Sequence, residues 1–358
     1  MQIGNYNSAF GKRLLKNKGA VLGLILIIAN LLLALFAYII APDSSSNGNR
    51  IIPEIGSKKP GFSIQFLQLK RDNIEPVNFF EKMVNGTQDA YQFIPITSYK
   101  IQGDSLKYNK FIDDDIIDRK TILINNAKQN VTPKTFYLGT DKFGRDILSR
   151  LIIGTRVSIG VGSIAVIISL TIGILLGAIA GYFRGWVDDV VMWFTNVIWS
   201  IPTLLLVFAI TLVLGKGFWQ VFIAVGLTMW VNVARLVRGQ VLAVRELEYI
   251  EATRALGYSH TRTIINHILP NILGPIMVIA ASNFASAIVI EAGLSFLGVG
   301  VQPPQPSWGL MIKENYNFII THNPMLALAP GFAIMQLVLA FNLLGNGLRD
   351  ALNVKGKL

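Results

Sequence analysis

The sequence contains no cysteine and only three histidines among its 358 residues. Without cysteine the chain has no disulfide framework, no Cys-ligated zinc site and no cysteine nucleophile. So few histidines also argue against a His-rich metal site. Charged residues make up only 15% of the chain, against roughly 25% in soluble domains. These absences argue against a water-soluble enzyme, and we expect neither a metal nor a cofactor.

Apolar residues, by contrast, make up 52% of the chain, and the mean hydropathy is +0.50. So much apolar surface excludes disorder and indicates a membrane protein. The net charge of +11 does not indicate a nucleic-acid partner. The basic residues flank apolar segments, and in that position they determine the topology in the lipid bilayer.

Six apolar segments are long enough to cross the membrane, which takes about 20 residues for roughly 30 Å of hydrocarbon. Each should be helical, because unpaired backbone groups are costly in lipid. The third should be kinked at Trp199-Ser200-Ile201-Pro202, and the fourth is the weakest because it is short and carries Asn232 near its end. The predicted helices are residues 20–41, 157–183, 190–214, 217–234, 272–296 and 325–347.

The basic residues predict the orientation of these helices. Residues 1–19 hold four basic and no acidic residues, and the loop 235–271 holds five arginines. Arg349, Lys355 and Lys357 follow the last helix. Because cytoplasmic loops are rich in Lys and Arg, we expect both termini and the loop 235–271 in the cytoplasm. The first helix is expected to be an uncleaved signal anchor; cleavage would leave the remaining topology unchanged.

The segment between the first two helices differs from the rest in composition. It is polar and contains three short β-rich runs, residues 62–69, 91–101 and 121–125, which predict a small β-leaning extracytoplasmic insertion. Its acidic cluster, Asp113–Asp115 with Asp118, lacks the spacing of a calcium loop and is expected to be a solvated turn. The chain thus divides into residues 1–42 (basic N-terminus and first helix), 43–136 (the insertion) and 137–358 (a core of five helices).

The motifs of the common hydrolases are missing. No G-x-x-x-x-G-K-[ST] sequence occurs, so the chain should have no P-loop ATP site, and G-x-S-x-G and H-E-x-x-H are absent too. We therefore expect no catalytic residue. Glu291 is the one acidic residue within the predicted helices, and it is either paired with a neighbour or part of a proton relay. Gly160 and Gly162 lie inside a span and should serve close helix packing.

The cytoplasmic loop has a pattern of its own. Residues 242–256 favour a helix, Gly257 can adopt the left-handed conformation that ends it, and Ser259 can cap the next helix. Pro270 should disrupt that second helix just before the fifth span. A short amphipathic helix, a sharp turn and a second helix would then project from the cytoplasmic face, in a form that suits a groove on a partner.

These residues resemble the EAA loop of ABC importer permeases. The match consists of Glu251-Ala252, Gly257 and Leu269-Pro270. Thr253 stands where the general pattern has a second Ala, and His267 where many members have Ile. The ending His-Ile-Leu-Pro-Asn is similar to the peptide/nickel branch. The resemblance implies that Glu251, Ala252, Thr253, Arg254, Gly257, Leu269 and Pro270 couple the chain to an ATPase; alternatively, Glu251 is only a solvated charge.

Three further stretches resemble C-type subunits of the same branch: residues 138–150, 181–189 and 293–309. In the first, Asp141, Arg145 and Asp146 have either a gating or subunit-contact role or form a surface ion-pair turn. In the third, Trp308 follows Pro303-Pro304, and these residues build either a rigid interfacial loop or a ligand box. Trp308 is also a candidate for the same gating or contact role.

The resemblance implies an all-α, six-helix type I permease bundle in the inner membrane of a bacterium, without an ATP site of its own. It further implies a heterodimer with a second permease subunit, two ATP-binding cassette ATPases, an extracytoplasmic binding protein and alternating access driven by ATP. The solute would be a di- or oligopeptide, or alternatively nickel or another peptide-like solute. Two other classes stay open: an ion-coupled secondary transporter, and a membrane scaffold whose functional part is the insertion.

Overall fold

The computed structural model describes residues 3–71, 77–113, 116–123, 129–215, 217–320 and 323–352. The chain forms two compact units. We call residues 1–31, 158–302 and 334–358 the helical unit, and residues 32–157 and 303–333 the sheet unit. The predicted domain boundaries at residues 42 and 136 stay predictions. Lys355 and Lys357 lie outside the described residues.

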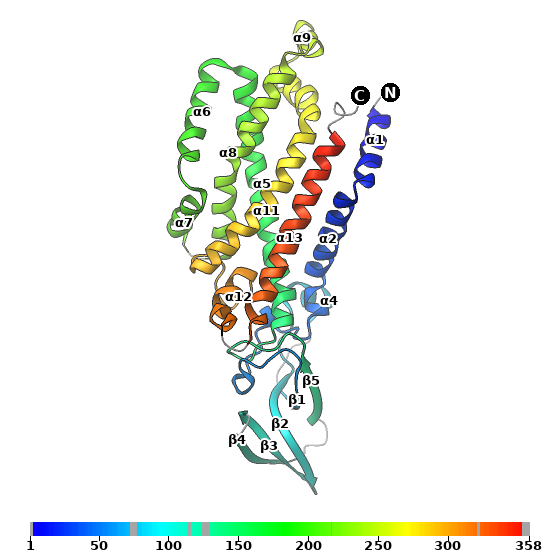
Figure 1. The fold of residues 1–358 in the computed structure, drawn as a ribbon, viewed down its shortest axis with the longest axis vertical. Coiled ribbons are helices and arrows are strands. Elements are labelled where there is room, and N and C mark those ends of the chain that lie inside the picture. The colour runs from blue at the N-terminus through cyan, green and yellow to red at the C-terminus, as the bar shows by residue number, and fades with distance from the viewer. Residues whose placement is uncertain are drawn as a thin grey trace. The chain divides into compact units, whose positions relative to one another are not determined.

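Five helices in the described part of the chain are long and apolar enough to cross a membrane (Figure 1). Together with one bent pair, they place a candidate span in each of the six predicted segments, which confirms a helical membrane fold. The basic helix α1 (Ile3–Lys16) precedes the first span, and the short α3 (Ala37–Ile40) follows it. The five are α2 (Lys18–Leu35), α5 (Ile147–Phe183), α8 (Phe218–Arg245), α10–α11 (His260–Leu297) and α13 (Met325–Leu352).

The predicted third span is the bent pair. It consists of α6 (Gly185–Trp199) and α7 (Thr203–Leu214), whose axes differ by 90°. The break confirms the predicted kink, because Pro202 has no N–H to donate and disfavours a helical conformation at the residue before it. The span is therefore not one straight helix.

The fourth span is longer than predicted. Instead of ending at residue 234, α8 runs for 28 residues to Arg245. Arg238 lies within this helix and donates two hydrogen bonds, of 2.5 and 2.6 Å, to the carboxylate of Asp188 on α6. Arg235 donates to Asn196 Oδ1 at 2.6 Å. Because these partners compensate the charges of the two arginines, α8 can continue past them. The predicted end of the span, placed before the first charged residue, is therefore too early.

Glycines bring α5 and α8 close together. Gly173, Gly177 and Gly181 recur every four residues on α5 and face α8; a Cβ at Gly177 would lie 2.5 Å from the carbonyl oxygen of Ala234. This backbone approach is typical of small residues in membrane helices. Of the two glycines predicted to serve packing, Gly162 faces the ring of Phe284 too closely for any Cβ, whereas Gly160 has only an ordinary contact.

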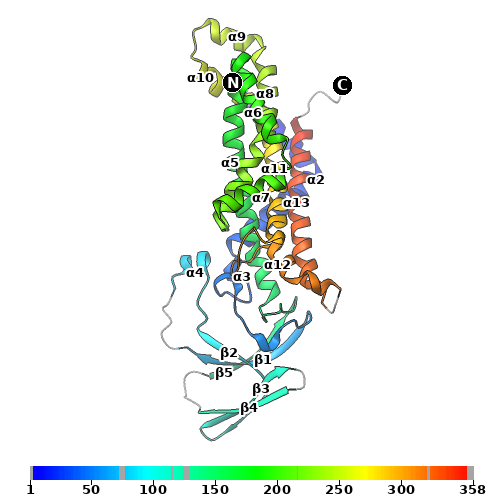
Figure 2. The ribbon, with the colours of Figure 1, turned by 90° about the vertical axis from the view of Figure 1, so that its left-hand side faces the viewer.

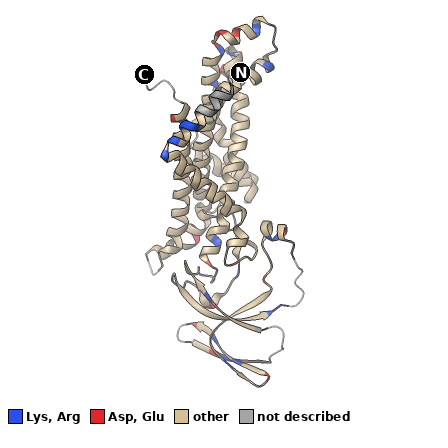
Figure 3. Cartoon of the chain, turned by 90° about the vertical axis from the view of Figure 1, so that its right-hand side faces the viewer, with Lys and Arg blue, Asp and Glu red and all other residues tan. Residues whose placement is uncertain are grey.

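One end of the helical unit gathers the N-terminus, the loop between α8 and α11, and the end of α13 (Figure 1). Asn17 Nδ2 donates a hydrogen bond of 3.1 Å to Asp350 Oδ2, which joins the first and last helices there. Several Lys and Arg residues lie at this end (Figure 3). The arrangement agrees with an even number of crossings, and the compartment that this end faces stays a prediction.

The sheet unit contains an antiparallel sheet of five strands, in the order β4-β3-β2-β1-β5 (Figure 2). The β-leaning insertion is thus confirmed. Two predicted strands match, β3 and β5 were not predicted, and β4 begins five residues before the predicted run. The strands are β1 (Phe62–Lys70), β2 (Tyr91–Gln102), β3 (Ser105–Asp113), β4 (Ile116–Leu123) and β5 (Gln129–Phe136).

Both faces of the sheet bury side chains, because adjacent residues of a strand point to opposite faces. Phe66 packs on one face with Ile52, Ile55, Phe111 and Phe136. Its neighbour Leu67 packs on the other face with Ile96, Leu106 and Tyr108. Smaller helices complete the unit: η1 (Ser46–Gly48), η2 (Pro53–Ile55), α4 (Phe79–Asn85), α12 (Trp308–Asn315) and η4 (Tyr316–Ile319).

The predicted acidic turn is only partly described. Asp113 ends β3, and Asp118 on β4 forms an exposed ion pair of 3.3 Å with Lys120. Asp114 and Asp115 lie outside the described residues. No group of three potential ligands that could hold a metal ion occurs in the described part of the chain.

Candidate coupling loop and polar cavity

The loop after α8 folds into a short helix and a sharp turn. The predicted helix over residues 242–256 is divided, because α8 ends at Arg245 and α9 (Glu248–Ala255) begins after a break. Gly257 has φ of +75°. Its N–H bonds to Arg254 O at 2.9 Å, and the N–H of Tyr258 bonds to Thr253 O at 3.0 Å, the hydrogen-bond pattern of a Schellman C-cap. The predicted left-handed cap is confirmed.

The turn leads into α10 (His260–Thr263). The hydroxyl of Ser259 accepts the N–H of Arg262 at 3.4 Å, as predicted for an N-cap. Pro270 does not end the helix that follows. A π-helical turn, η3 (Ile264–Ile268), joins α10 to α11 (Leu269–Leu297), and the N–H of Leu269 bonds to Ile264 O. The wider turn accommodates the missing N–H of Pro270 without a break.

The two sides of α9 have different surroundings. Ile250 and Thr253 are buried in the chain itself, and the Thr253 hydroxyl donates to Ile250 O at 2.7 Å. Glu251, Ala252 and Arg254 are exposed. Thr253 thus lies on the side of α9 that packs against its own chain, and its predicted coupling role stays a prediction. Apolar side chains continue the exposed surface at its ends: Leu247, Tyr249 and Leu256.

The buried side of α9 connects it to the spanning helices. Ile250 belongs to an apolar cluster with Tyr182 of α5, Val237 of α8 and Ile272 of α11. The Tyr182 hydroxyl lies 2.9 Å from His260 Nδ1, and the guanidinium of Arg254 lies 5.2 Å from the centre of the Tyr182 ring. Through this cluster α9 contacts three spanning helices. The contacts of Tyr182 with the loop were not predicted, because Tyr182 is far from the loop in sequence and no motif connects them.

The second group of predicted site residues lies in the sheet unit. Arg145 Nε donates to Asp141 Oδ2 at 2.6 Å, and Arg145 Nη2 donates to Glu314 Oε2 of α12 at 2.8 Å. Asp141 and Arg145 are 1% and 3% exposed. They do form an ion-pair turn, but it is buried and not at the surface. Whether it has a gating or subunit-contact role stays a prediction.

Asp146 and Trp308 both contact the first turns of α5. Asp146 immediately precedes α5 and accepts hydrogen bonds from the N–H and hydroxyl of Ser149, as an N-cap does. Burial raises the pKa of the Asp146 carboxyl above its usual value, although the bonds from Ser149 oppose this shift. Trp308 is buried and donates through Nε1 to Leu151 O of α5 at 3.0 Å. Both side chains hold the entry to α5 in place.

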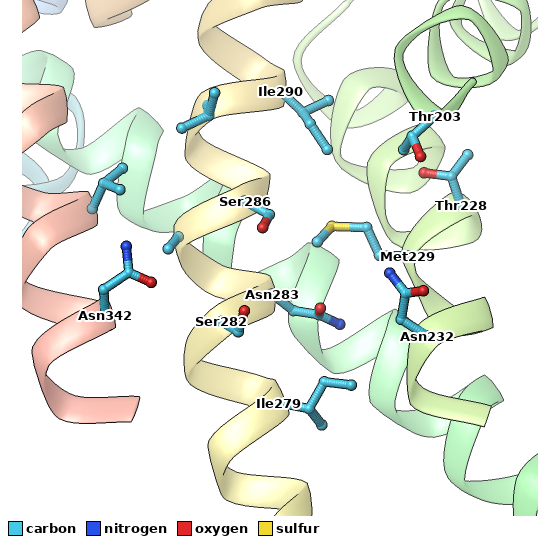
Figure 4. A pocket seen from close by; sticks show the side chains of 13 residues that line it. Thr203, Thr228, Met229, Asn232, Ile279, Ser282, Asn283, Ser286, Ile290 and Asn342 are labelled. Atoms are coloured by element: carbon cyan, nitrogen blue, oxygen red, sulfur yellow. The ribbon is translucent and has the colours of Figure 1, made fainter. Parts of the chain in front are cut away.

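A cavity of about 660 Å³ lies within the helical unit, between α7, α8, α11 and α13 (Figure 4). Among the residues that the structure describes, its polar lining consists of amides and hydroxyls, without a charged or histidine side chain. In Figure 4, Asn283 and Ser286 of α11 point toward α8, which carries Met229 and Asn232. The polar residues are Thr203, Thr228, Asn232, Ser282, Asn283, Ser286 and Asn342.

Three asparagines in the sequence could have indicated this cavity. Asn232, Asn283 and Asn342 carry amides inside apolar spans. Polar groups are costly in lipid, so their presence in a span indicates a functional site. In the sequence analysis Asn232 counted only as evidence against the fourth span. Glu291 does not line the cavity; it is buried on α11 and accepts a hydrogen bond of 2.6 Å from the Ser295 hydroxyl.

Apolar spanning helices, a bent helix pair, a polar internal cavity and a projecting helical loop together define a polytopic helical membrane protein of the transporter type. Residues 173–355 match the model of the binding-protein-dependent transport system inner membrane component. Residues 8–55 match that of the N-terminal transmembrane domain of oligopeptide transport permease C. The chain belongs to the family of inner-membrane components of binding-protein-dependent transport systems. It is thus a multi-pass inner-membrane permease and not itself the ATPase.

Individual relatives match over 62% of this chain. The glutathione transport system permease protein GsiD of Pectobacterium atrosepticum is 42% identical, with 73% of that protein covered. The dipeptide transport system permease protein DppC of Alkalihalophilus pseudofirmus is 43% identical and the oligopeptide transport system permease protein OppC of Bacillus subtilis 40% identical, each with 72% covered. A solved structure of the MetNI methionine ABC transporter aligns with 57% of this chain and 97% of its own, at 18% identity and a TM-score of 0.48.

Proposed function

We propose that this chain is a permease subunit of an ATP-driven importer for dipeptides, oligopeptides or glutathione. The three relatives named above are permeases for these three kinds of solute. The other parts would be a second, related permease subunit, two cytoplasmic ATPases and an extracytoplasmic binding protein. Both termini and α9 lie on the cytoplasmic side in this proposal.

The observation that carries the proposal is the attachment of α9. One side of this helix is buried against α5, α8 and α11 through Ile250, and the other side presents Glu251, Ala252 and Arg254 outward. A partner that grips the exposed side can therefore move the spanning helices. ATP-driven closure of the ATPase pair would displace α9 as a rigid body, and the capped turn at Gly257 would pass this motion to α11.

The polar cavity supports the same proposal from the solute side. Peptides carry many N–H and C=O groups, which must be hydrogen-bonded when they leave water. The amides and hydroxyls around Asn232 and Asn283 can supply such bonds. No described residue that lines the cavity is ionised, so the lining does not favour one sign of solute charge over the other. We place the solute path along this cavity.

Substitution of Gly257 tests the coupling. A built Cβ at Gly257 meets no atom within 4 Å, so the space around the Cβ is open and the expected effect of a substitution is on the backbone preference. Gly257→Val disfavours the left-handed turn by about 1–2 kcal/mol, which corresponds to about tenfold. In the assembled transporter we expect ATP hydrolysis to continue while uptake falls by about that factor.

Gly257→Asn is the matched control, because Asn tolerates the left-handed conformation. It should retain most of the uptake. Normal uptake by Gly257→Val would contradict the coupling role of this turn. Uptake that persists without any ATPase and stops when the proton gradient is collapsed would instead indicate a secondary transporter.

A further inference from the structure

Helix α4, which joins β1 to β2 in the sheet unit, exposes apolar side chains. Phe79, Phe80 and Val84 are 61%, 75% and 53% exposed. At 100° per residue, these three and Met83 fall within about 140° of the helix circumference, whereas Glu81 and Lys82 lie on the remainder. The rings of Phe79 and Phe80 contact each other edge to face, with 5.9 Å between their centroids. The helix therefore presents an aromatic face that nothing in the described chain covers.

This helix is fixed to two membrane helices. Gly86, directly after α4, packs so closely on Tyr38 of α3 that a Cβ there would lie 2.9 Å from the ring. Arg156 of α5 donates through Nη1 to Val84 O at 2.7 Å, and its guanidinium lies 4.9 Å from the centre of the Tyr38 ring. These contacts all lie within the sheet unit, and Figure 2 shows α4 beside α3.

The lengths of the two helices locate these contacts in the membrane. Tyr38 follows Lys18, where α2 begins, by 20 residues, which is about 30 Å of helix and thus about one hydrocarbon thickness. Arg156 precedes Phe183, the end of α5, by 27 residues, or about 40 Å. By chain length, α4 therefore contacts the segment that ends the first candidate span and the first third of α5, the positions expected at one membrane boundary.

The end of the first candidate span, next to α4, also exposes apolar side chains. Phe36, Ile39 and Ile40, at the end of the first span, are exposed, and α3 packs against α4. Aromatic side chains next to Lys and Arg are typical of the interface between lipid and water. Arg156 can keep its charge at the headgroups while its stem lies against Tyr38.

We propose that α4 is an interfacial anchor, in which Phe79, Phe80 and Val84 insert into the bilayer surface and hold the sheet unit against the membrane. The partner is the lipid bilayer. This inference needs neither the ATPase nor the solute. It gives the insertion a second attachment, besides the chain connections at its two ends.

The absence of cysteine allows a direct test by site-directed labelling. Phe80→Cys in the full chain, carrying a nitroxide and reconstituted in phospholipid nanodiscs, is examined for collisions with oxygen and with a water-soluble nickel chelate. Oxygen concentrates in lipid and the chelate in water. We expect the label at residue 80 to collide at least several times more with oxygen, relative to the chelate, than a label in water does.

Ile101→Cys provides the water-exposed reference. Ile101 is 64% exposed and lies ten residues beyond Tyr91, the start of β2, or about 33 Å along the strand. Phe79→Cys serves if the variant at residue 80 does not fold. Free access of the chelate at residues 79 and 80 would overturn the proposal. Protection from both reagents would also overturn it and would indicate that protein, not lipid, covers α4.

Discussion

Arg145 pairs with two carboxylates in a buried cluster, so we expect its substitution to destabilise the fold strongly. It holds the buried Asp141 at 2.6 Å and Glu314 at 2.8 Å. Removing one partner from a buried ion pair typically costs about 3–5 kcal/mol, because the remaining charge is left without compensation. We therefore expect Arg145→Met to lower the thermal stability and the yield of folded protein strongly, as measured by melting in detergent.

Lys120→Met is the control for this prediction. Lys120 and Asp118 form an ion pair of 3.3 Å, but both side chains are about half exposed. Exposed pairs contribute roughly 0–1 kcal/mol, so this variant should melt almost as the unmodified protein does. Equal shifts in the two variants would show that burial of the Arg145 cluster does not matter to stability.

Individual residues were predictable where local chemistry alone determines the conformation. The cap at Gly257 and the cap at Ser259 depend only on neighbouring backbone groups, so the sequence contains what is needed. The direction of Thr253 was not predictable. It depends on the packing of α9 against α5 and α8, helices that the loop meets only after the chain has folded.

At the scale of elements, the cavity requires four helices that are far apart in the sequence. Asn232 on α8 lines the cavity together with residues of α7, α11 and α13. Asn232→Leu keeps a similar volume and removes the hydrogen-bonding group. We expect uptake to fall by about tenfold, which corresponds to one lost hydrogen bond of about 1.5 kcal/mol to the passing solute.

ATP hydrolysis distinguishes this effect from misfolding. The Asn232→Leu transporter should still respond to its binding protein with ATP turnover, because α9 and its attachments are unchanged. Thr171→Val is the control: Thr171 lies exposed on α5, bonds to Ile167 O at 2.8 Å and does not line the cavity. Unaltered uptake by Asn232→Leu would mean that the solute takes another path.

The spanning helices followed from apolar run length, but their ends did not. The predicted fourth span ends before Arg235 and is too short, because the stabilising partners Asp188 and Asn196 lie on another helix. The strands were harder to predict than the helices. β5 contains Pro133 among polar residues, and it can still form a strand because it lies at the edge of the sheet, where a missing N–H is tolerated. Its pairing with β1 is a long-range contact.

At the scale of the whole molecule, the orientation predicted from Lys and Arg can be checked with one labelling site. Ala252→Cys would be the single cysteine of the chain, on the exposed side of α9. A membrane-impermeant maleimide should label it in inside-out vesicles and leave it unlabelled in intact cells. Ile101→Cys, in the insertion, should give the reverse result. Labelling of residue 252 from outside would remove the basis for ATPase coupling.

The role of the insertion is the last point at this scale. The two family models match residues 8–55 and 173–355, so the whole sheet lies outside both. The N–H of Gly61 bonds to Phe136 O at 2.9 Å, so the ends of the segment meet, and Phe62–Thr135 can be replaced by Gly-Ser without stretching the chain. We expect this variant to insert into the membrane and to keep ATP-coupled uptake, because no residue of α9 or of the cavity is removed. The shorter variant also loses α4 and uncovers Ile52 and Ile55, so lower thermal stability is expected. Complete loss of uptake with normal membrane insertion would instead make the insertion part of the transport machinery, and would favour a permease that receives its binding protein on the sheet.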